Sequence, residues 1–151
     1  MPDDLPALPR GELAPAFELS DRNGVRVSRA QFRGRRFLTL LFFSPDHAPE
    51  SLLSGLATEH ERLEWFEVEV LAMVPSIPSD LPPDHPPLRY LADPSLTVTR
   101  RFTNLTEQGP RTTVVVLDRY GAVEQRWDEP ALPTTKEVLD LLERLAHTCS
   151  G

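Results

Sequence analysis

The positions of apolar residues along the chain follow two kinds of pattern, and each kind predicts a type of element. Residues 37–43 and 67–74 are short, nearly continuous apolar runs, which are typical of strands buried on both faces of a sheet. Residues 51–66 and the segment from 134 onward carry leucines at helical spacing among charged residues, which predicts two amphipathic helices. A buried strand, a helix and a second buried strand in this order predict a parallel crossover.

Turn and capping signals organise the chain before the first buried strand. Asn23-Gly24 separates two pairs of alternating apolar residues, which predicts a β-hairpin over residues 17–27. Ser28 followed by Gln31 is a capping box, and it predicts a short helical turn after the hairpin.

The second half of the chain carries weaker signals. Prolines at residues 75–87 predict a stiff loop, because each one removes a backbone donor. Asp93-Pro94 predicts the start of a helix that runs through Phe102, and residues 104–110 are predicted to be a loop. A short strand, a third buried strand and its antiparallel partner are predicted at residues 88–91, 112–117 and 122–127.

The order of these elements predicts an α/β thioredoxin-like fold, with a central mixed sheet flanked by helices and an N-terminal β-hairpin extension. Residues 1–10 are acidic and proline-rich, which predicts a loose arm, and residues 11–148 are predicted to form the single domain.

Composition narrows the function only by exclusion. The net charge of −7 argues against nucleic acid as a partner. Fifteen of the sixteen basic residues are arginine, which we interpret as a codon bias. The start of the chain has no apolar core of a signal peptide, and no apolar run is long enough to span a membrane, so we expect a cytoplasmic protein.

Sulfur and histidine give no support for a metal or a disulfide. The chain has one cysteine, Cys149, so an internal disulfide is impossible. His60, His85 and His147 lack the spacing of metal ligands, and we expect neither a metal nor a cofactor.

The most informative stretch is residues 37–56, FLTLLFFSPDHAPESLLSGL, where a buried strand leads through a short loop into a helix. A helix start presents several backbone N–H groups at one place, so this junction is a candidate site. Residues 11–19 read GELAPAFEL and residues 112–121 read TTVVVLDRYG. Together these segments resemble the thioredoxin-like redoxins, which include the TlpA-type thiol–disulfide oxidoreductases and the AhpC/TSA peroxiredoxin-like group.

The resemblance places the family's Cys-Pro-x-Cys motif on Ala48, Pro49, Glu50 and Ser51. A peroxiredoxin alignment instead places the peroxidatic cysteine on Ser51, after one deletion. In both alignments the redox sulfur is absent, so the resemblance implies a degenerate site with no catalytic residue.

Two other roles are open for residues at this junction. Ser51 is interpreted as a helix-start hydroxyl that satisfies a backbone N–H. His47 precedes Ser51 by four residues, as in a nucleophile pair, but it lies in the loop before the helix and no third residue is available to orient its imidazole. We therefore favour a surface ring in place of the family's aromatic residue.

A second loop completes the site that the resemblance implies. The family has a cis-proline or an active-site arginine near this point, and Pro110, Arg111 and Thr112 are the candidate residues here. We therefore expect a groove between residues 44–51 and residues 109–113.

These observations favour a redox-inactive, redoxin-like binding or interaction module. Its expected ligand is an extended peptide or a small anionic molecule held in the groove. The alternative is a thiol–disulfide oxidoreductase or peroxiredoxin-like antioxidant enzyme that uses an external thiol or Cys149. A subunit that binds another protein through a sheet edge or helix face is a third possibility.

Overall fold

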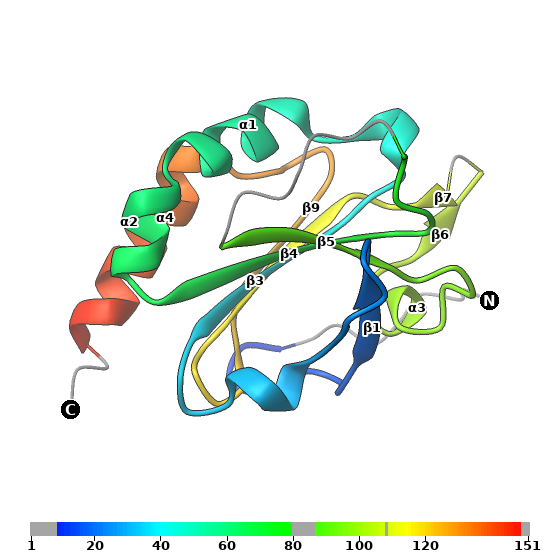
Figure 1. Cartoon of the computed structure of the whole chain (residues 1–151). Coiled ribbons are helices and arrows are strands. Elements are labelled where there is room, and N and C mark those ends of the chain that lie inside the picture. The colour runs from blue at the N-terminus through cyan, green and yellow to red at the C-terminus, as the bar shows by residue number, and fades with distance from the viewer. Residues whose placement is uncertain (1–8, 80–86, 108, 149–151) are drawn as a thin grey trace.

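A seven-stranded mixed sheet forms the centre of the protein, as expected from the sequence (Figure 1). The computed structural model describes residues 9–79, 87–107 and 109–148. The strands lie in the order β2-β1-β5-β4-β3-β8-β9. In chain order they are β1 (Glu18–Asp21), β2 (Arg26–Ser28), β3 (Phe37–Phe42), β4 (Val68–Val74), β5 (Leu88–Ala92), β8 (Thr113–Leu117) and β9 (Val123–Asp128).

Strand β3 lies near the middle of this sheet and sets the position of the candidate site. It pairs in parallel with β4 and antiparallel with β8, and β4 pairs in parallel with β5. All residues of β3 and β4 are buried, which explains their nearly continuous apolar sequences. The parallel pairing of β3 and β4 confirms the predicted crossover.

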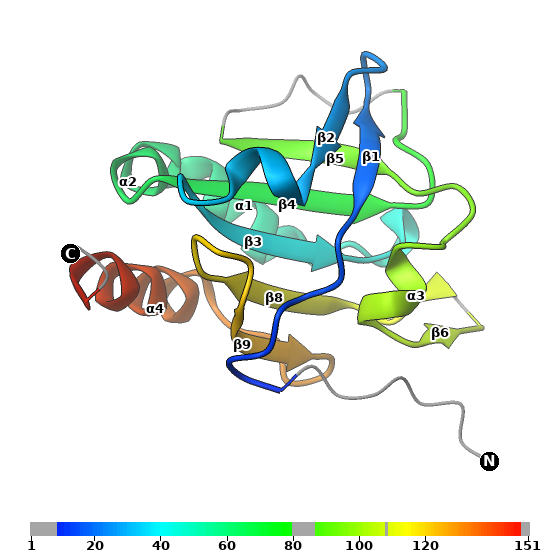
Figure 2. The same cartoon turned by 90° about the horizontal axis from the view of Figure 1, so that it is seen from below.

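Helices cover both faces of the sheet. Figure 1 shows α1 (Glu50–Thr58), α2 (His60–Trp65) and α4 (Thr135–Thr148) together on one face. Figure 2 shows the 3₁₀ helix η1 (Arg29–Phe32) and the short α3 (Thr99–Phe102) on the opposite face. Each face has its own apolar core. Leu56 and Leu142 belong to the core under α1, α2 and α4, and Phe42 stacks on Phe102 in the core under η1 and α3.

The local signals near the two ends of the chain are confirmed. Strands β1 and β2 form the predicted hairpin, and Gly24 adopts a φ of 80° in its turn. At the start of α4, Glu137 N–H donates to Thr134 Oγ1, and Thr134 N–H donates to the Glu137 carboxylate. These reciprocal bonds are the capping box that the sequence predicts.

The helix predicted over residues 51–66 is two helices, so that part of the prediction is wrong. α1 begins one residue earlier, at Glu50, and ends at Thr58, and α2 begins at His60. Glu59 lies between them with φ −94° and ψ 25°, outside the helical range. His60 Nδ1 lies 3.0 Å from the Ala57 carbonyl oxygen, so a side chain satisfies a backbone acceptor at the break.

The helix predicted from Asp93 to Phe102 is also wrong, because only Thr99–Phe102 is helical. Asp93 Oδ2 accepts hydrogen bonds from Thr99 N–H at 2.6 Å and Thr99 Oγ1 at 2.7 Å. The buried Asp93 thus caps a turn that begins six residues later, and Leu96 between them has a φ of 60°.

The loop predicted over residues 104–110 contains a small hairpin, of β6 (Leu105–Thr106) and β7 (Gly109–Pro110). Most of the predicted N-terminal arm and residues 80–86 of the proline-rich loop lie outside the described residues. Within the described residues, no helix combines the length and apolar character needed to cross a membrane.

Candidate functional site

The junction that the sequence singled out lies at the carboxyl end of β3. The strand ends at Phe42, the 3₁₀ helix η2 (Pro45–His47) follows, and α1 begins at Glu50. Ala48, Pro49, Glu50 and Ser51 therefore span the last residues of the loop and the first turn of the helix. The positions on which the sequence resemblance places redox cysteines, Ala48 and Ser51, therefore lie next to the helix start, where a thiolate would be stabilised.

Ser51 is not a helix cap. Pro49 occupies the N-cap position, and no side chain accepts a hydrogen bond there. Ser51 is the second residue of α1 and is exposed, so the interpretation of its hydroxyl as a capping group is wrong. His47 is exposed as well, and the structure shows no hydrogen bond between its ring and the Ser51 hydroxyl. A Ser–His nucleophile pair has no geometric support.

The second loop approaches the first near Ser44, and the groove expected between the two loops stays a prediction. A Cβ atom added to Gly109 would lie 3.3 Å from Ser44 Cβ, so the two backbones are close at this point. Pro110 is buried within β7, and Thr112 is buried just before β8. Residues 44–51 and 109–113 thus meet near Ser44, while Ala48 to Ser51 extend away from this contact along α1.

Arg111 is engaged in holding its own loop. Its Nη2 and Nε donate to the Glu129 carbonyl oxygen at 2.9 and 3.3 Å, and its backbone N–H donates to the Asn104 carbonyl. The Glu129 carboxylate in turn accepts the Thr112 N–H at 2.9 Å. These bonds join the 104–112 segment to the end of β9, and they leave Arg111 half-buried.

A partly buried polar network beside this loop was missed by sequence reasoning. Thr113 Oγ1 donates to Asp128 Oδ1 at 2.6 Å and lies 2.8 Å from Thr103 Oγ1. Arg126 adds a two-pronged contact to Asp128, through Nε at 2.9 Å and Nη2 at 3.1 Å. Burial favours a higher pKa for Asp128, but the hydrogen bonds from Arg126 and Thr113 and the charge of Arg126 outweigh it and lower that pKa.

A hollow of about 660 Å³ lies beside residues 48–50, against Val74 at the end of β4 and Tyr90 in the middle of β5. Most of its lining is apolar, and the acidic residues Asp46 and Glu50 and the hydroxyl of Ser54 supply the polar part. The apolar lining consists of Phe43, Pro45, Ala48, Leu53, Val74, Pro78 and Tyr90. Its volume is within the usual range for a ligand pocket.

The hollow brings together residues that the sequence analysis did not associate. Of the candidate positions, Ala48 and Glu50 line it, and Leu53, Ser54 and Tyr90 were not anticipated. Ser54 follows Glu50 by four residues and Leu53 follows it by three, so helical spacing from Glu50 would have indicated this face of α1. Tyr90 belongs to β5, and no pattern in the sequence connects it to α1.

Among the described residues, no group of three or more histidine, cysteine or acidic side chains is arranged to hold a metal ion. Cys149, the candidate thiol of the alternative reading, lies outside the described residues.

Comparisons with known proteins connect the chain to others through structure. No protein-family model matches the sequence, and no curated protein matches it. The reduced 2-Cys peroxiredoxin of Plasmodium vivax superposes with a TM-score of 0.76 over 94% of this chain and 99% of its own, at 18% identity.

Two further solved structures give the same result. Thioredoxin peroxidase I of Plasmodium yoelii matches with a TM-score of 0.74 and 19% identity, over 94% of this chain and 93% of its own. The mitochondrial 2-Cys peroxiredoxin of Plasmodium falciparum matches with a TM-score of 0.76 and 16% identity, over 95% and 97%. At these identities the likeness shows a shared peroxiredoxin, thioredoxin-like fold, and a shared fold does not by itself define an activity.

Proposed function

We propose that this chain is a redox-inactive protein with a peroxiredoxin-like fold and that it acts by binding a ligand. The observation that carries the proposal is that Ala48 directly precedes the N-cap of α1 and Ser51 is the second residue of α1, in the segment that follows the central strand. Neither an alanine methyl group nor a serine hydroxyl can form a disulfide or be oxidised as a thiolate is. The neighbouring structures are described as peroxiredoxins, and this chain has their fold with a single cysteine, Cys149.

The hollow beside Ala48 supports a peptide rather than an anion as the ligand. Asp46 and Glu50 are exposed at its edge, and a negatively charged ligand would be repelled by both carboxylates. Glu50 also occupies the first turn of α1, where its charge already complements the positive end of the helix. An extended peptide with apolar side chains and a lysine or arginine matches both the lining and the charge.

The second candidate is an oxidoreductase that uses an external thiol or Cys149. Its support is that Cys149 is the only thiol in the chain, so any covalent sulfur chemistry of the protein itself must pass through it. A redox assay and a binding assay separate the two candidates.

The first prediction concerns redox chemistry. The purified protein should neither consume hydrogen peroxide in the presence of dithiothreitol nor accelerate the reduction of insulin by dithiothreitol. The Cys149→Ser variant should behave identically. The double replacement Ala48→Cys and Ser51→Cys, made in the Cys149→Ser background, should close a disulfide on treatment with oxidised glutathione. Each closure transfers two electrons to one glutathione disulfide and releases two reduced glutathione molecules.

The outcomes distinguish the candidates clearly. Turnover in the wild type that is lost in Cys149→Ser would establish the enzyme alternative. A double-cysteine variant that stays reduced would show that residues 48 and 51 are not placed as a redox pair. The rates of peroxide consumption and insulin reduction measure the first result, and mass spectrometry after alkylation of free thiols measures the second.

The second prediction concerns the peptide. In a fluorescence polarisation assay, an extended peptide of alternating leucine and lysine should bind more tightly than the same peptide with glutamate in place of lysine. Glu50→Gln should weaken the lysine peptide by about threefold to tenfold, which corresponds to about 1 kcal/mol for one partly exposed charge pair. Glu61→Gln is the matched control, because Glu61 is an exposed acid on α2 and does not line the hollow.

Equal binding of the lysine and glutamate peptides would contradict the charge argument. Equal weakening by Glu50→Gln and Glu61→Gln would show that the peptide senses only the net charge of the protein. Tighter binding of the glutamate peptide would favour an anionic ligand, which the free N–H groups of the helix start suggested.

A further inference from the structure

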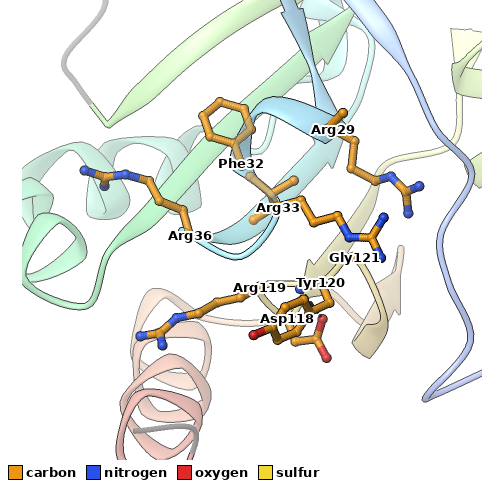
Figure 3. Close-up of a pocket in the computed structure, with 10 residues that line it drawn as sticks. Arg29, Phe32, Arg33, Arg36, Asp118, Arg119, Tyr120 and Gly121 are labelled. Atoms are coloured by element: carbon orange, nitrogen blue, oxygen red, sulfur yellow. Dashed lines mark hydrogen bonds between the residues drawn. The ribbon is translucent and has the colours of Figure 1, made fainter. Parts of the chain in front are cut away.

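A second pocket lies at the amino end of β3, at the opposite end of the strand from residues 44–51 (Figure 3). Its volume is about 50 Å³, which is room for roughly four water-sized groups. The lining comes from η1 and the residues after it, and from the turn between β8 and β9. Its charged members are Arg29, Arg33, Arg36, Asp118 and Arg119, and its aromatic members are Phe32 and Tyr120.

The pocket belongs to the most basic segment of an acidic chain. Residues 22–36 contain six arginines and no acidic residue, although the net charge of the whole chain is −7. The arginines are Arg22, Arg26, Arg29, Arg33, Arg35 and Arg36. A cluster of one sign produces a local positive potential that net charge conceals.

Two of the pocket's arginines are already paired with carboxylates. Arg36 Nη1 lies 2.6 Å from Glu64 Oε1, and Arg119 Nη2 lies 3.2 Å from Glu67 Oε1. The Arg119 guanidinium also lies 4.8 Å from the centre of the Phe37 ring. Figure 3 shows both side chains extending away from the other two arginines.

The other two arginines are not neutralised. Arg29 Nη1 donates to the Ala14 carbonyl oxygen at 2.8 Å, which fixes the side chain and leaves its charge uncompensated. Arg33 is exposed and makes no hydrogen bond or ion pair with any described residue through its side chain. In Figure 3 the two guanidinium groups extend to the same side, above the turn at Gly121.

The local backbone is shaped so that Arg29 can reach this position. A Cβ atom on Gly121 would lie 2.6 Å from Arg29 Nη1, so a larger residue would displace the guanidinium. Asp118 is the acidic member of the lining, and it stabilises the same turn. Its Oδ1 accepts hydrogen bonds from the N–H groups of Tyr120 and Ala122 at 2.8 and 2.9 Å. Its charge is therefore partly satisfied by the backbone.

We propose that this pocket binds the phosphate group of a small molecule, with Arg29 and Arg33 as its donors. Guanidinium groups match the oxygens of a phosphate with two parallel hydrogen bonds, and the pocket is the size of such a group but not of a whole nucleotide. The rest of the ligand would lie outside, against the ring of Tyr120, which lines the pocket and is 62% exposed. The site shares no lining residue with the hollow beside Ala48, so it stands independently of the proposed binding function.

The test is an NMR titration of the ¹⁵N-labelled full chain at fixed ionic strength, with inorganic phosphate, ribose 5-phosphate and adenosine 5′-monophosphate as probes. Saturable shifts are expected for the backbone amides of residues 33–34 and 119–121. Arg33→Gln should weaken binding about fivefold or more, as loss of one charge-assisted contact predicts. Arg35→Gln is the matched control, because Arg35 is also exposed and outside the pocket lining, and the replacement removes the same charge.

Each outcome decides a point. Tighter binding of the nucleotide than of ribose 5-phosphate supports a ligand whose ring packs on Tyr120, and equal binding assigns recognition to the phosphate alone. Absence of saturable shifts with all three probes overturns the proposal. Equal weakening by Arg33→Gln and Arg35→Gln also overturns it, because the effect would then report net charge. The amide spectra of both variants verify that they are folded.

Discussion

A carboxylate lies near arginine at each end of β3, half-buried at the carboxyl end and buried at the amino end, and the pKa values of the two carboxylates shift in opposite directions. At the carboxyl end, Thr113 pairs with Phe42, and its hydroxyl donates to Asp128, which also receives two hydrogen bonds from Arg126. The pKa of Asp128 is lowered, because these bonds and charges overcome its burial.

At the amino end, Glu69 pairs across the sheet with Leu38 and has only electrostatic support. Arg36 Nε and Arg89 Nη2 lie 3.7 and 3.4 Å from its oxygens, and Glu69 Oε1 is buried without a hydrogen bond. Burial raises the pKa of Glu69, and the attraction of Arg89 and Arg36 does not offset it. Nearby charge without aligned hydrogen bonds is therefore not enough to keep a buried carboxylate at its ordinary pKa.

The same contrast applies to the arginines themselves. At the carboxyl end, Arg111 and Arg126 are bonded to the Glu129 carbonyl and to Asp128, so they stabilise loops. At the amino end, Arg29 and Arg33 have no carboxylate partner among the described residues. At the carboxyl end of β3 the arginines are thus used in contacts within the protein, while at the amino end Arg29 and Arg33 keep positive charge available for a ligand.

The largest expected effect on stability comes from alanine substitutions of two glycines, Gly121 at the amino end of β3 and Gly109 at its carboxyl end. Both have positive φ, 90° for Gly121 and 112° for Gly109. Gly121→Ala should lower the free energy of unfolding by about 2 kcal/mol, because backbone strain adds to the loss of the hydrogen bond from Arg29 to Ala14. Gly109→Ala should cost about 1 kcal/mol, since its backbone strain is accompanied only by a close contact of 3.3 Å with Ser44 Cβ and by no lost hydrogen bond.

Urea denaturation of both variants measures the difference. Phosphate affinity is a second measurement. Gly121→Ala should lower this affinity because it displaces Arg29, while Gly109→Ala should leave the affinity unchanged. Equal losses of stability in the two variants would show that Arg29 moves aside without cost, and that its contact with Ala14 does not hold the amino end together.

The elements that sequence reasoning recovered are those with strong local causes. The hairpin at Asn23-Gly24 and the capping box of Thr134 and Glu137 are determined by residues within a few positions of each other. The buried strands β3 and β4 were recognisable because nearly all their residues are apolar, as is typical of strands buried on both faces.

The elements that it missed depend on contacts that a periodic pattern does not contain. The helix predicted after Asp93 fails because the Asp93 carboxylate bonds to Thr99 instead of to the next turn. The break at Glu59 is invisible in the spacing of the leucines, since Leu56 and Leu63 are both buried on either side of it.

The candidate sites show the same limit. The positions of Ala48 and Ser51 at a helix start followed from one continuous segment, whereas the arginine pocket joins residues 29–36 to residues 118–121 across the fold. A signal was present in the six arginines without an acid between residues 22 and 36. The interpretation of the arginines as a codon bias does not use this signal, and only the structure distinguishes Arg36, which is paired with Glu64, from Arg33, which has no carboxylate partner among the described residues.

The smaller prediction tests the two carboxylates by their opposite pH dependence. The folded-state pKa of Asp128 lies below its ordinary value of 3.8, so its contribution to stability is present above that pH and is lost as pH falls through the folded pKa. The folded-state pKa of Glu69 lies above 4.5, so its contribution is fully present below that pH and is lost as pH rises through the folded pKa.

Asp128→Asn should therefore destabilise the protein at pH 7 by about 1–2 kcal/mol, and the loss should shrink as the pH approaches 3. Glu69→Gln should leave the stability at pH 7 unchanged or slightly higher, because it removes a buried charge that has no hydrogen bond at Oε1. Urea denaturation of both variants between pH 3 and pH 7 measures the two slopes. A loss at pH 7 in Glu69→Gln as large as that in Asp128→Asn would break the comparison, because Arg36 and Arg89 would then be stabilising Glu69 as effectively as hydrogen bonds stabilise Asp128.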